Sequence, residues 1–250
     1  MNTLRALFDS GVPVIAVSFD DTDCARSAKA ALAAAVDVAE LRIDQFAKSD
    51  PDHVLEQIAA FRGLPVLATV RAAHEGGGWT GSDEERLALF RAVAPVVDAV
   101  DVELSSHAIV ADVIAAAREH DALVIVSYHD FDVTPPVDEL AGIVADAKAA
   151  GADVVKISTM ATAKADVKAL ASLLTDADDD TELIVIAMGA IGSVSRIFFP
   201  ALGSRLTYSF LEHRPTSGQL DYDETFRLIR RFYPDFDQRK TTAPQTPGSV

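Results

Sequence analysis

A single lysine interrupts an apolar run, Val154-Val-Lys-Ile, at position 156. β-branched residues surround it, which predicts a buried strand over residues 153–159. Burial disfavours the charged ammonium form of a lysine, so its amine becomes a nucleophile toward carbonyl carbons. We therefore predict that Lys156, the only one of seven lysines in an apolar strand, forms an imine with a carbonyl substrate. A structural ion pair with a carboxylate such as Glu103 is the alternative.

One histidine has a position suited to proton transfer beside this lysine. His129 is the only one of six histidines within a predicted strand, and that strand precedes the strand of Lys156. Imidazole exchanges protons near neutral pH, so we expect His129 to act as general base and acid around the imine. Glu75, in the loop after the third strand, is expected to orient the imidazole. The alternatives are a hydrogen-bonded core histidine and an ordinary loop carboxylate, and the neighbouring His74 is the weaker candidate.

Three arginines fall at or just beyond the ends of predicted strands. In a chain with few basic residues, guanidinium groups at such places indicate a ligand rich in oxygen atoms, with a carboxylate that is bound in bidentate fashion. Buried ion pairs with carboxylates such as Glu40, Asp44 and Glu103 are the alternative. The three arginines are Arg42, Arg71 and Arg196.

Loop composition adds weaker signals. The run MGAIGSVSR, residues 188–196, is typical of a loop that enters a helix and binds phosphate, but no lysine flanks it. The loops over residues 75–86 and 213–224 contain glycine or proline, and they are either lids or plain connections. The sequence has no His-x-x-x-His pair and no dense carboxylate triplet, so it does not predict a metal site.

The elements that position these residues alternate regularly. Eight apolar, β-branched segments are separated by helix-like segments, such as residues 82–96 with a Ser-x-x-Glu capping pattern and residues 138–151 with a terminal glycine. This alternation predicts an α/β fold, a single-domain (β/α)8 TIM barrel. A doubly wound open sheet is the alternative, but no Gly-x-Gly-x-x-Gly motif follows the first strand. The predicted strands span residues 12–19, 37–44, 65–71, 99–104, 123–130, 153–159, 182–189 and 205–211.

Polar residues recur at alternate positions near the ends of these strands. Ser127 and His129 share one parity of their strand, and Lys156 and Ser158 share one parity of the next. If the polar parity faces the barrel interior, these side chains converge at the C-terminal mouth, where barrel enzymes have their active sites. The first strand has no obvious polar inward residue. The other predicted inward residues are Glu40, Arg42, Asp44, Thr69, Arg71, Asp101, Glu103, Arg205, Thr207 and Ser209.

The composition limits the class of protein. The 250 residues are 49% hydrophobic, and 22 basic against 38 acidic residues leave a formal net charge of −16. This charge argues against nucleic-acid or anionic-membrane partners, and no segment reads as a signal peptide or membrane span, so we expect a cytoplasmic protein. The single cysteine excludes an internal disulfide framework. The composition resembles that of proteins from salt-accumulating archaea.

The chain has no internal linker. We therefore predict one barrel domain over residues 1–239. Residues 240–250 are rich in Pro, Thr and Ser, which predicts a disordered tail.

Seven segments together resemble a known family, type I 3-dehydroquinate dehydratase. They occur in the family's order and at fitting distances, and the combination is highly specific although no single segment is. The segments are ELRID (40–44), TVRAAHEGG (69–77), DVEL (101–104), SYHDF (127–131) followed by TP (134–135), GADVVKI (151–157), MGAIGSVSR (188–196) and SGQ (217–219).

The resemblance implies a barrel that converts 3-dehydroquinate to 3-dehydroshikimate in the shikimate pathway, without metal or organic cofactor and often as a homodimer. By resemblance, Lys156 forms the imine, His129 moves the substrate protons, and Glu75 pairs with His129. Elimination of water beside a ketone needs an electron sink, and a protonated imine is a better sink than the ketone. The matching substrate contacts are Arg196 and Gln219 for the carboxylate, Glu40, Arg42 and Arg71 for the ring hydroxyls, and Met188 in the pocket wall.

One loop departs from the family pattern. Family members usually read Ser-Ala-Pro-Gly-Gln there, whereas this chain reads PTSGQ over residues 215–219. Pro215 therefore stands where the family has a ligand-binding serine. Ser217 or Thr216 is the candidate replacement.

Two other functions are compatible with the same residues. A class I aldolase-like carbon–carbon lyase would share the imine lysine, and analysis of the product would distinguish it. A catalytically silent barrel would bind a small acid without turnover. The joint match of Lys156, His129, Glu75 and the arginines favours the dehydratase.

Overall fold

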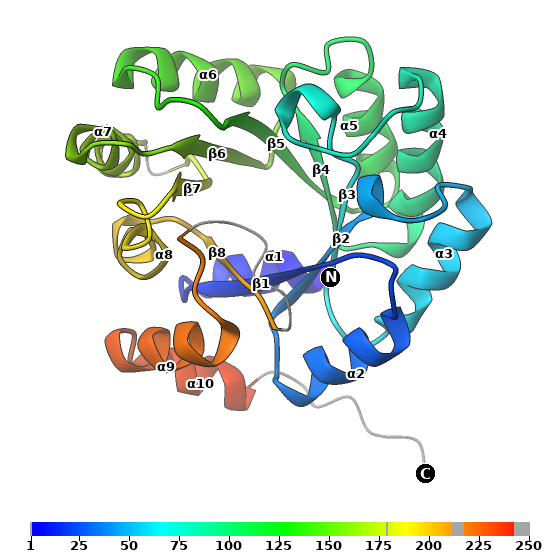
Figure 1. Ribbon diagram of the computed structural model, residues 1–250, viewed down its shortest axis with the longest axis horizontal. Coiled ribbons are helices and arrows are strands. Elements are labelled where there is room, and N and C mark those ends of the chain that lie inside the picture. Colours follow the sequence, from blue (N-terminus) through cyan, green and yellow to red (C-terminus); the bar gives the residue numbers. More distant parts are fainter. Residues whose placement is uncertain (1, 179, 212–217, 243–250) are drawn as a thin grey trace.

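Eight parallel strands form a barrel (Figure 1). The computed structural model describes residues 2–178, 180–211 and 218–242. The strands pair in the order β7-β6-β5-β4-β3-β2-β1-β8, and β7 meets β8 where the backbone N–H of Arg205 donates to the carbonyl of Leu183 (2.9 Å). The predicted (β/α)8 barrel is confirmed, and the open-sheet alternative is wrong. The strands are β1 (Val14–Phe19), β2 (Val38–Arg42), β3 (Val66–Thr69), β4 (Ala99–Glu103), β5 (Leu123–Asp130), β6 (Val154–Met160), β7 (Leu183–Met188) and β8 (Leu206–Ser209).

Helices surround the strands, because each connection between neighbouring parallel strands has to cross the outside of the sheet (Figure 1). They are α1 (Thr3–Asp9), α2 (Cys24–Ala33), α3 (Pro51–Ala60), α4 (Asp83–Val93), α5 (Val110–Glu119), α6 (Val137–Ala150), α7 (Lys164–Thr175), α8 (Ser195–Phe198), α9 (Tyr222–Phe232) and α10 (Asp235–Thr242). Short 3-10 helices span Ile43–Gln45, Ala73–Glu75, Ala94–Val96 and Phe199–Leu202.

Local sequence signals set the ends of two helices. The Ser82 hydroxyl accepts the backbone N–H of Glu85 (3.2 Å), and the Glu85 carboxylate accepts the backbone N–H of Ser82 (2.8 Å), so α4 begins at a complete capping box. Helix α6 ends at Gly151, whose φ of 110° is a left-handed conformation that glycine adopts without strain. Both helices lie where the sequence predicted them.

The barrel interior has an apolar floor below a polar layer. Leu4 and Phe8 of α1 close the amino-terminal end and pack against inward residues such as Val14, Leu67 and Leu123. The opposite parity of the strands packs against the surrounding helices. Polar inward residues therefore lie near the carboxyl ends of the strands, as predicted for β2 to β6.

The predicted inward parity of β8 is wrong. Tyr208 points into the barrel, where its hydroxyl lies 3.0 Å from Lys156 Nζ. The Ser209 hydroxyl instead donates to the carbonyl of Leu220 (3.0 Å), just before α9. The prediction placed Tyr208 on the outward parity because its ring is apolar. Its hydroxyl, however, has its partners Lys156 and Glu40 inside the barrel.

The predicted C-terminal tail begins inside a helix. Helix α10 continues to Thr242, so residues 240–242 belong to it, and residues 243–250 lie outside the described part of the chain. Within that described part, none of the helices combines the length and the apolar character that a membrane crossing requires.

Candidate active site

A cavity of about 250 Å³ opens at the carboxyl ends of the strands. Of the ten residues predicted for the site, nine line this cavity, although they come from distant parts of the chain. The tenth, Ser217, lies outside the described residues. The nine are Glu40, Arg42, Arg71, Glu75, His129, Lys156, Met188, Arg196 and Gln219.

Lys156 lies at the centre of the polar layer and is only 4% exposed. Its Nζ donates to Asp101 Oδ2 (2.8 Å) and to the Tyr208 hydroxyl (3.0 Å), and it lies 3.7 Å from Glu40 Oε1. The partner is thus Asp101 and not Glu103, the carboxylate that the sequence suggested. Two carboxylates therefore lie beside Nζ, and an ammonium at this position has to lose a proton before it can attack a carbonyl.

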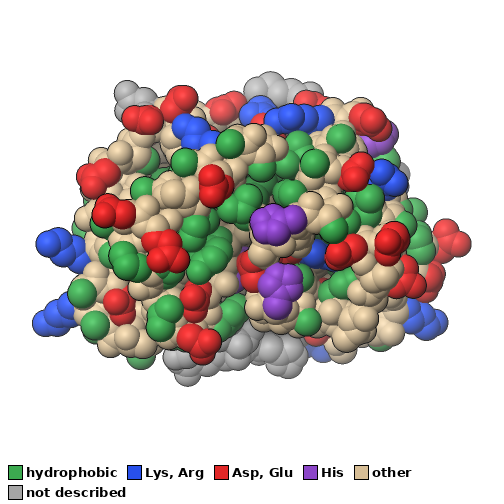
Figure 2. Space-filling view, turned by 90° about the horizontal axis from the view of Figure 1, so that it is seen from above, with side chains coloured by type: hydrophobic (Ala, Val, Ile, Leu, Met, Phe, Trp, Pro, Cys, Tyr) green, Lys and Arg blue, Asp and Glu red, His purple; other side chains and the backbone are tan. Residues whose placement is uncertain are grey.

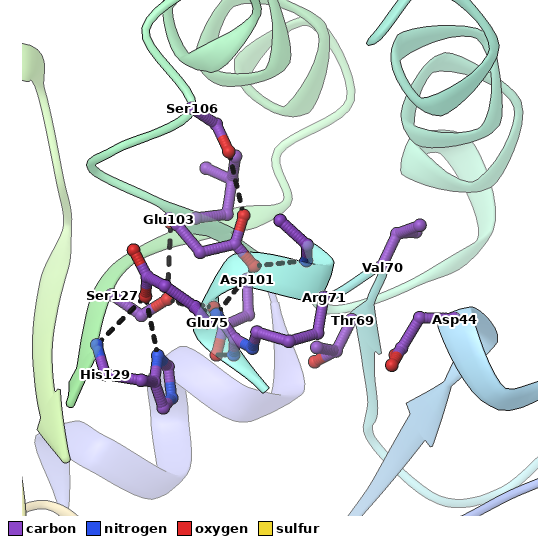
Figure 3. Close-up of polar contacts among 12 residues, drawn as sticks. Asp44, Thr69, Val70, Arg71, Glu75, Asp101, Glu103, Ser106, Ser127 and His129 are labelled. Carbon is purple, nitrogen blue, oxygen red and sulfur yellow. Dashed lines mark hydrogen bonds and ion pairs between the residues drawn. The ribbon is translucent and has the colours of Figure 1, made fainter. Parts of the chain in front are cut away.

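His129 and Glu75 form a hydrogen-bonded pair beside the cavity (Figure 3). His129 Nδ1 lies 3.1 Å from Glu75 Oε2, and the same oxygen accepts the backbone N–H of His129 (2.9 Å). Because a carboxylate only accepts, the pair leaves the proton on Nδ1 and Nε2 free to act as a base. Burial, followed by the charges of Arg71 and Lys156, lowers the pKa of His129 well below its ordinary value.

Glu75 is held by a second partner that the sequence analysis missed. Burial raises the pKa of Glu75 and so favours its neutral, protonated form. The Ser105 hydroxyl donates to Glu75 Oε1 and opposes this effect. His74 Nε2 lies 2.8 Å from the same hydroxyl, so the exposed histidine touches the site through Ser105.

Arg71 is bound by carboxylates on two sides (Figure 3). Its guanidinium lies 2.9 Å from Asp101 Oδ2 and 2.9 Å from Glu103 Oε1, and it donates to the Ser127 hydroxyl (2.6 Å). Burial alone would lower the pKa of Arg71, but the two carboxylates raise it above its ordinary value. Arg86 of α4 donates to the other oxygen of Glu103 from outside the barrel.

The two remaining arginines differ in their partners. Arg42 forms a bidentate ion pair with Asp44 (2.9 and 2.8 Å) at the cavity rim. Arg196 is 4% exposed, and no carboxylate of the described residues forms an ion pair with it. Burial lowers the pKa of Arg196 to about 10. The ion-pair alternative therefore applies to Arg42 and Arg71, whereas Arg196 is a buried cation that no carboxylate of the described residues neutralises.

Unpaired polar atoms mark one side of the cavity. Arg196 Nε and Gln219 Oε1 are both buried, and neither has a hydrogen-bond partner within residues 2–178, 180–211 and 218–242. Buried polar atoms are normally paired, so an unpaired set that lines a cavity indicates where a ligand supplies the missing partners. Met188 contributes an apolar wall to the same cavity.

Glu40 accepts hydrogen bonds from hydroxyl groups on three strands. Its Oε1 accepts from Thr69 (3.0 Å) and Tyr208 (3.3 Å), and its Oε2 accepts from Ser18. Ser18 is the polar inward residue of β1 that the sequence analysis did not find. The pairing of Ser18 with Glu40 across β1 and β2 would have identified it, but only once the register was known.

Asp101 and Tyr208 are the other functional candidates without a role in the sequence analysis. Asp101 has the predicted inward parity in β4, so its position carried a signal. Among the described residues, no group of three or more His, Cys, Asp or Glu side chains is arranged to hold a metal ion.

Comparisons with known proteins agree with this geometry. The model of the family described as type I 3-dehydroquinase matches residues 13–233. A 3-dehydroquinate dehydratase of Methanothermobacter thermautotrophicus is 36% identical over 210 residues, which cover 84% of this chain and 91% of that protein. The corresponding protein of Aquifex aeolicus is 32% identical over 222 residues, with 88% and 99% covered.

Solved structures show the same fold. The crystal structure of the Aquifex aeolicus 3-dehydroquinate dehydratase has a TM-score of 0.80 at 31% identity and covers 88% of this chain and 99% of its own. A Clostridium difficile type I 3-dehydroquinate dehydratase with covalently modified comenic acid has a TM-score of 0.84 at 26% identity, with 90% and 94% covered. The sequence and structural matches together show that the chain belongs to the type I 3-dehydroquinase family.

Proposed function

We propose that this enzyme dehydrates 3-dehydroquinate to 3-dehydroshikimate through an imine at Lys156, as a step of the shikimate pathway. The family assignment supports the overall reaction, a hydro-lyase reaction on a small-molecule substrate. The observation that carries the residue assignment is the position of Lys156. Its amine lies buried in the cavity that His129 and Arg196 also line.

The proposed reaction begins when the neutral Lys156 amine attacks the substrate ketone. The adduct takes back the proton that the ammonium had given up, and its hydroxyl leaves as water. The protonated imine that remains accepts the electrons left when His129 removes the C2 proton. His129 then donates that proton to the departing hydroxyl, so the reaction releases one water molecule. Hydrolysis of the imine frees the product and restores the lysine.

Arg196 supports an anionic substrate. The net charge of −16 repels anions at long range, but a buried guanidinium that no described carboxylate neutralises binds a substrate carboxylate strongly at short range. We assign Arg196 and Gln219 to the substrate carboxylate. Glu40, Arg42 and Arg71 are assigned to the ring hydroxyls, because each is already fixed in place by neighbouring side chains.

The test is to incubate the protein with 3-dehydroquinate and borohydride, then to measure intact mass and map the peptides. Borohydride reduces the imine, so we expect one adduct at Lys156. Lys156→Ala should give no adduct and no turnover with the fold intact. His129→Ala should still form some adduct but dehydrate slowly, by roughly 100-fold or more.

Other outcomes distinguish the alternatives. Substantial turnover by Lys156→Ala would remove the imine mechanism. An adduct with carbon–carbon cleavage products would indicate the aldolase-like lyase. Binding of 3-dehydroquinate without adduct or product would indicate the silent barrel.

We also propose that the enzyme acts as a cytoplasmic homodimer, as the family resemblance implies. Exposed apolar side chains of Val194 and Phe198, at α8, and of Phe232, on the adjacent α9, support an interface on this side. Light scattering during size-exclusion chromatography measures the mass. A monomeric mass at micromolar concentration would contradict the proposal, and Phe198→Lys tests whether this side is the interface.

A further inference from the structure

The Lys156 ammonium needs a route for its proton. An ammonium has no lone pair, so one N–H bond has to break before Nζ attacks the substrate carbonyl. Lys156 is only 4% exposed, and a substrate that fills the cavity covers it further, so its proton needs an acceptor among the neighbouring side chains. The titratable and charged groups that face it are Glu40 from β2, Asp101 from β4, His129 from β5 and Tyr208 from β8, with Arg71 behind Asp101.

Asp101 is the nearest carboxylate but a poor proton acceptor. Burial would raise the pKa of Asp101, yet the charges of Arg71 and Lys156 hold it well below its ordinary value. Its Oδ1 also accepts from the Ser127 hydroxyl (2.6 Å). Among the described residues, the hydrogen bonds of Lys156 Nζ go to Asp101 and Tyr208 and not to His129, so the imidazole is not placed to take this proton directly.

Glu40 differs from Asp101 in its partners. Its three hydrogen-bond donors are the neutral hydroxyls of Ser18, Thr69 and Tyr208. Among the described residues, the Lys156 ammonium is the cation that forms an ion pair with it, at 3.7 Å. Direct transfer over that distance is slow, because a proton moves between heavy atoms that are within hydrogen-bond reach.

The Tyr208 hydroxyl bridges this gap in the required direction. It accepts from Lys156 Nζ (3.0 Å) and donates to Glu40 Oε1 (3.3 Å). We propose that Tyr208 is a catalytic residue that passes the Lys156 proton to Glu40 and so prepares the amine for attack. This proposal rests on the imine mechanism proposed above.

The transfer balances without any further reactant. One N–H bond of Lys156 breaks as its proton moves to the Tyr208 oxygen, and the phenolic O–H bond breaks as that proton moves to Glu40. The ammonium and carboxylate become an amine and a carboxylic acid, and Tyr208 stays neutral. Burial, and then the charges of Glu40 and Asp101, raise the pKa of Tyr208 well above its ordinary value. A concerted relay is therefore favoured over a tyrosinate. Glu40 returns its proton through Tyr208 when the hydroxyl of the tetrahedral adduct leaves as water, and hydrolysis of the protonated imine then regenerates the Lys156 ammonium.

Tyr208→Phe tests this proposal because it removes only the hydroxyl and keeps the ring, whose centroid lies 4.7 Å from Nζ. Rapid mixing with 3-dehydroquinate, followed by a borohydride quench and intact mass, measures the rate of adduct formation across pH. We expect this rate to fall by about 10-fold or more near neutral pH. The deficit should narrow as the pH rises, because hydroxide then removes the proton without the relay. The KM should change little.

Tyr222→Phe is the matched control, since it removes another buried phenolic hydroxyl, which donates to the Ala35 carbonyl (2.9 Å) away from the cavity. It should form the adduct at the wild-type rate. If Tyr208→Phe does not fold, Glu40→Gln at saturating substrate is the second variant. Its amide cannot accept the proton, so adduct formation should again be slow near neutral pH.

Three results would overturn the relay. One is a wild-type rate and pH profile in Tyr208→Phe, and another is an equal slowing at every pH together with lost thermal stability, which indicates a structural role. In both cases the wild-type protein still forms the adduct, so the imine mechanism stands. The third is absence of the adduct in the wild-type protein, which removes the imine mechanism and the relay together.

Discussion

Arg42, Arg71 and Arg196 carry the same guanidinium group, but their surroundings give them different roles. Arg42 and Arg71 have carboxylate partners within 2.9 Å, so their charges are balanced before any ligand arrives. Arg196 has no such partner among the described residues. An unbalanced buried charge costs folding free energy, and a protein that retains one gains a strong binding site for an anion.

Arg196→Met should therefore separate stability from binding. Replacing the unpaired cation by an apolar side chain should raise the free energy of unfolding by about 1 kcal/mol or more. The same change should raise the KM for 3-dehydroquinate roughly 30-fold or more, since a buried contact between charges is lost. Urea unfolding and steady-state kinetics measure the two effects. A lower stability would show that Arg196 is structural.

Ser105 should control the pH dependence of the reaction through Glu75. Its hydroxyl opposes the effect of burial on the pKa of Glu75, so Ser105→Ala should raise that pKa further. A protonated Glu75 no longer orients His129, and the acid limb of kcat/KM should therefore move to higher pH. Ser105→Thr keeps a hydroxyl and should retain the wild-type limb. An unchanged profile in Ser105→Ala would remove this role.

At the scale of elements, the strands that are buried on both faces were the most predictable. The observed bounds of β5 are those predicted, residues 123–130, and Ser127 pairs with Lys156 in β6 on the inward parity. Strand β8 was not predictable in the same way. Its parity depends on the pairing of Ala16 with Tyr208 across β1 and β8. These two strands lie far apart in the chain, so the residues around each of them do not reveal how the strands pair.

The glycine-rich loop after β3 holds Glu75 in place by a close approach of its backbone. A Cβ at Gly77 would lie 2.0 Å from the Arg71 carbonyl oxygen, so Gly77→Ala has to displace the loop. We expect a loss of about 1–3 kcal/mol in unfolding free energy. We also expect a clear fall in kcat, because Glu75 moves with the loop. The fluorescence of Trp79, the single tryptophan, should report the displacement.

Gly142→Ala is the matched control for this substitution. Gly142 lies within α6, and a Cβ there meets nothing within 4 Å. Alanine is the better helix former, so this variant should gain roughly 0.5–1 kcal/mol in stability and keep wild-type kcat. Equal kcat in the two variants would show that the loop does not position Glu75.

At the scale of the whole molecule, the floor of the barrel and its mouth are separate regions. Helix α1 closes the floor, where Leu4 is fully buried. On the outer surface, acidic side chains are scattered over the face that Figure 2 shows. Leu4→Ala should cost about 2–5 kcal/mol of unfolding free energy, measured in urea, with little change in KM. Leu7→Ala, at a half-buried position of the same helix, should cost less. A large rise in KM for Leu4→Ala would show that the floor and the mouth are coupled.

Local sequence patterns were enough to predict the alternation of strands and helices, the caps of α4 and α6, and the inward parity of Lys156 and His129, whereas Met188 and Gln219 were candidates only through the family resemblance. These features depend on local patterns of burial and hydrogen bonding, which neighbouring residues specify. Only the tertiary structure decided how the side chains pair. Asp101 rather than Glu103 contacts Lys156, and Tyr208 turns inward to join Lys156 and Glu40. In the part of the chain that the structure describes, Arg196 alone of the three arginines has no carboxylate partner. Such pairings depend on the register of strands far apart in the chain, because an interaction between two charges is set by their distance in space.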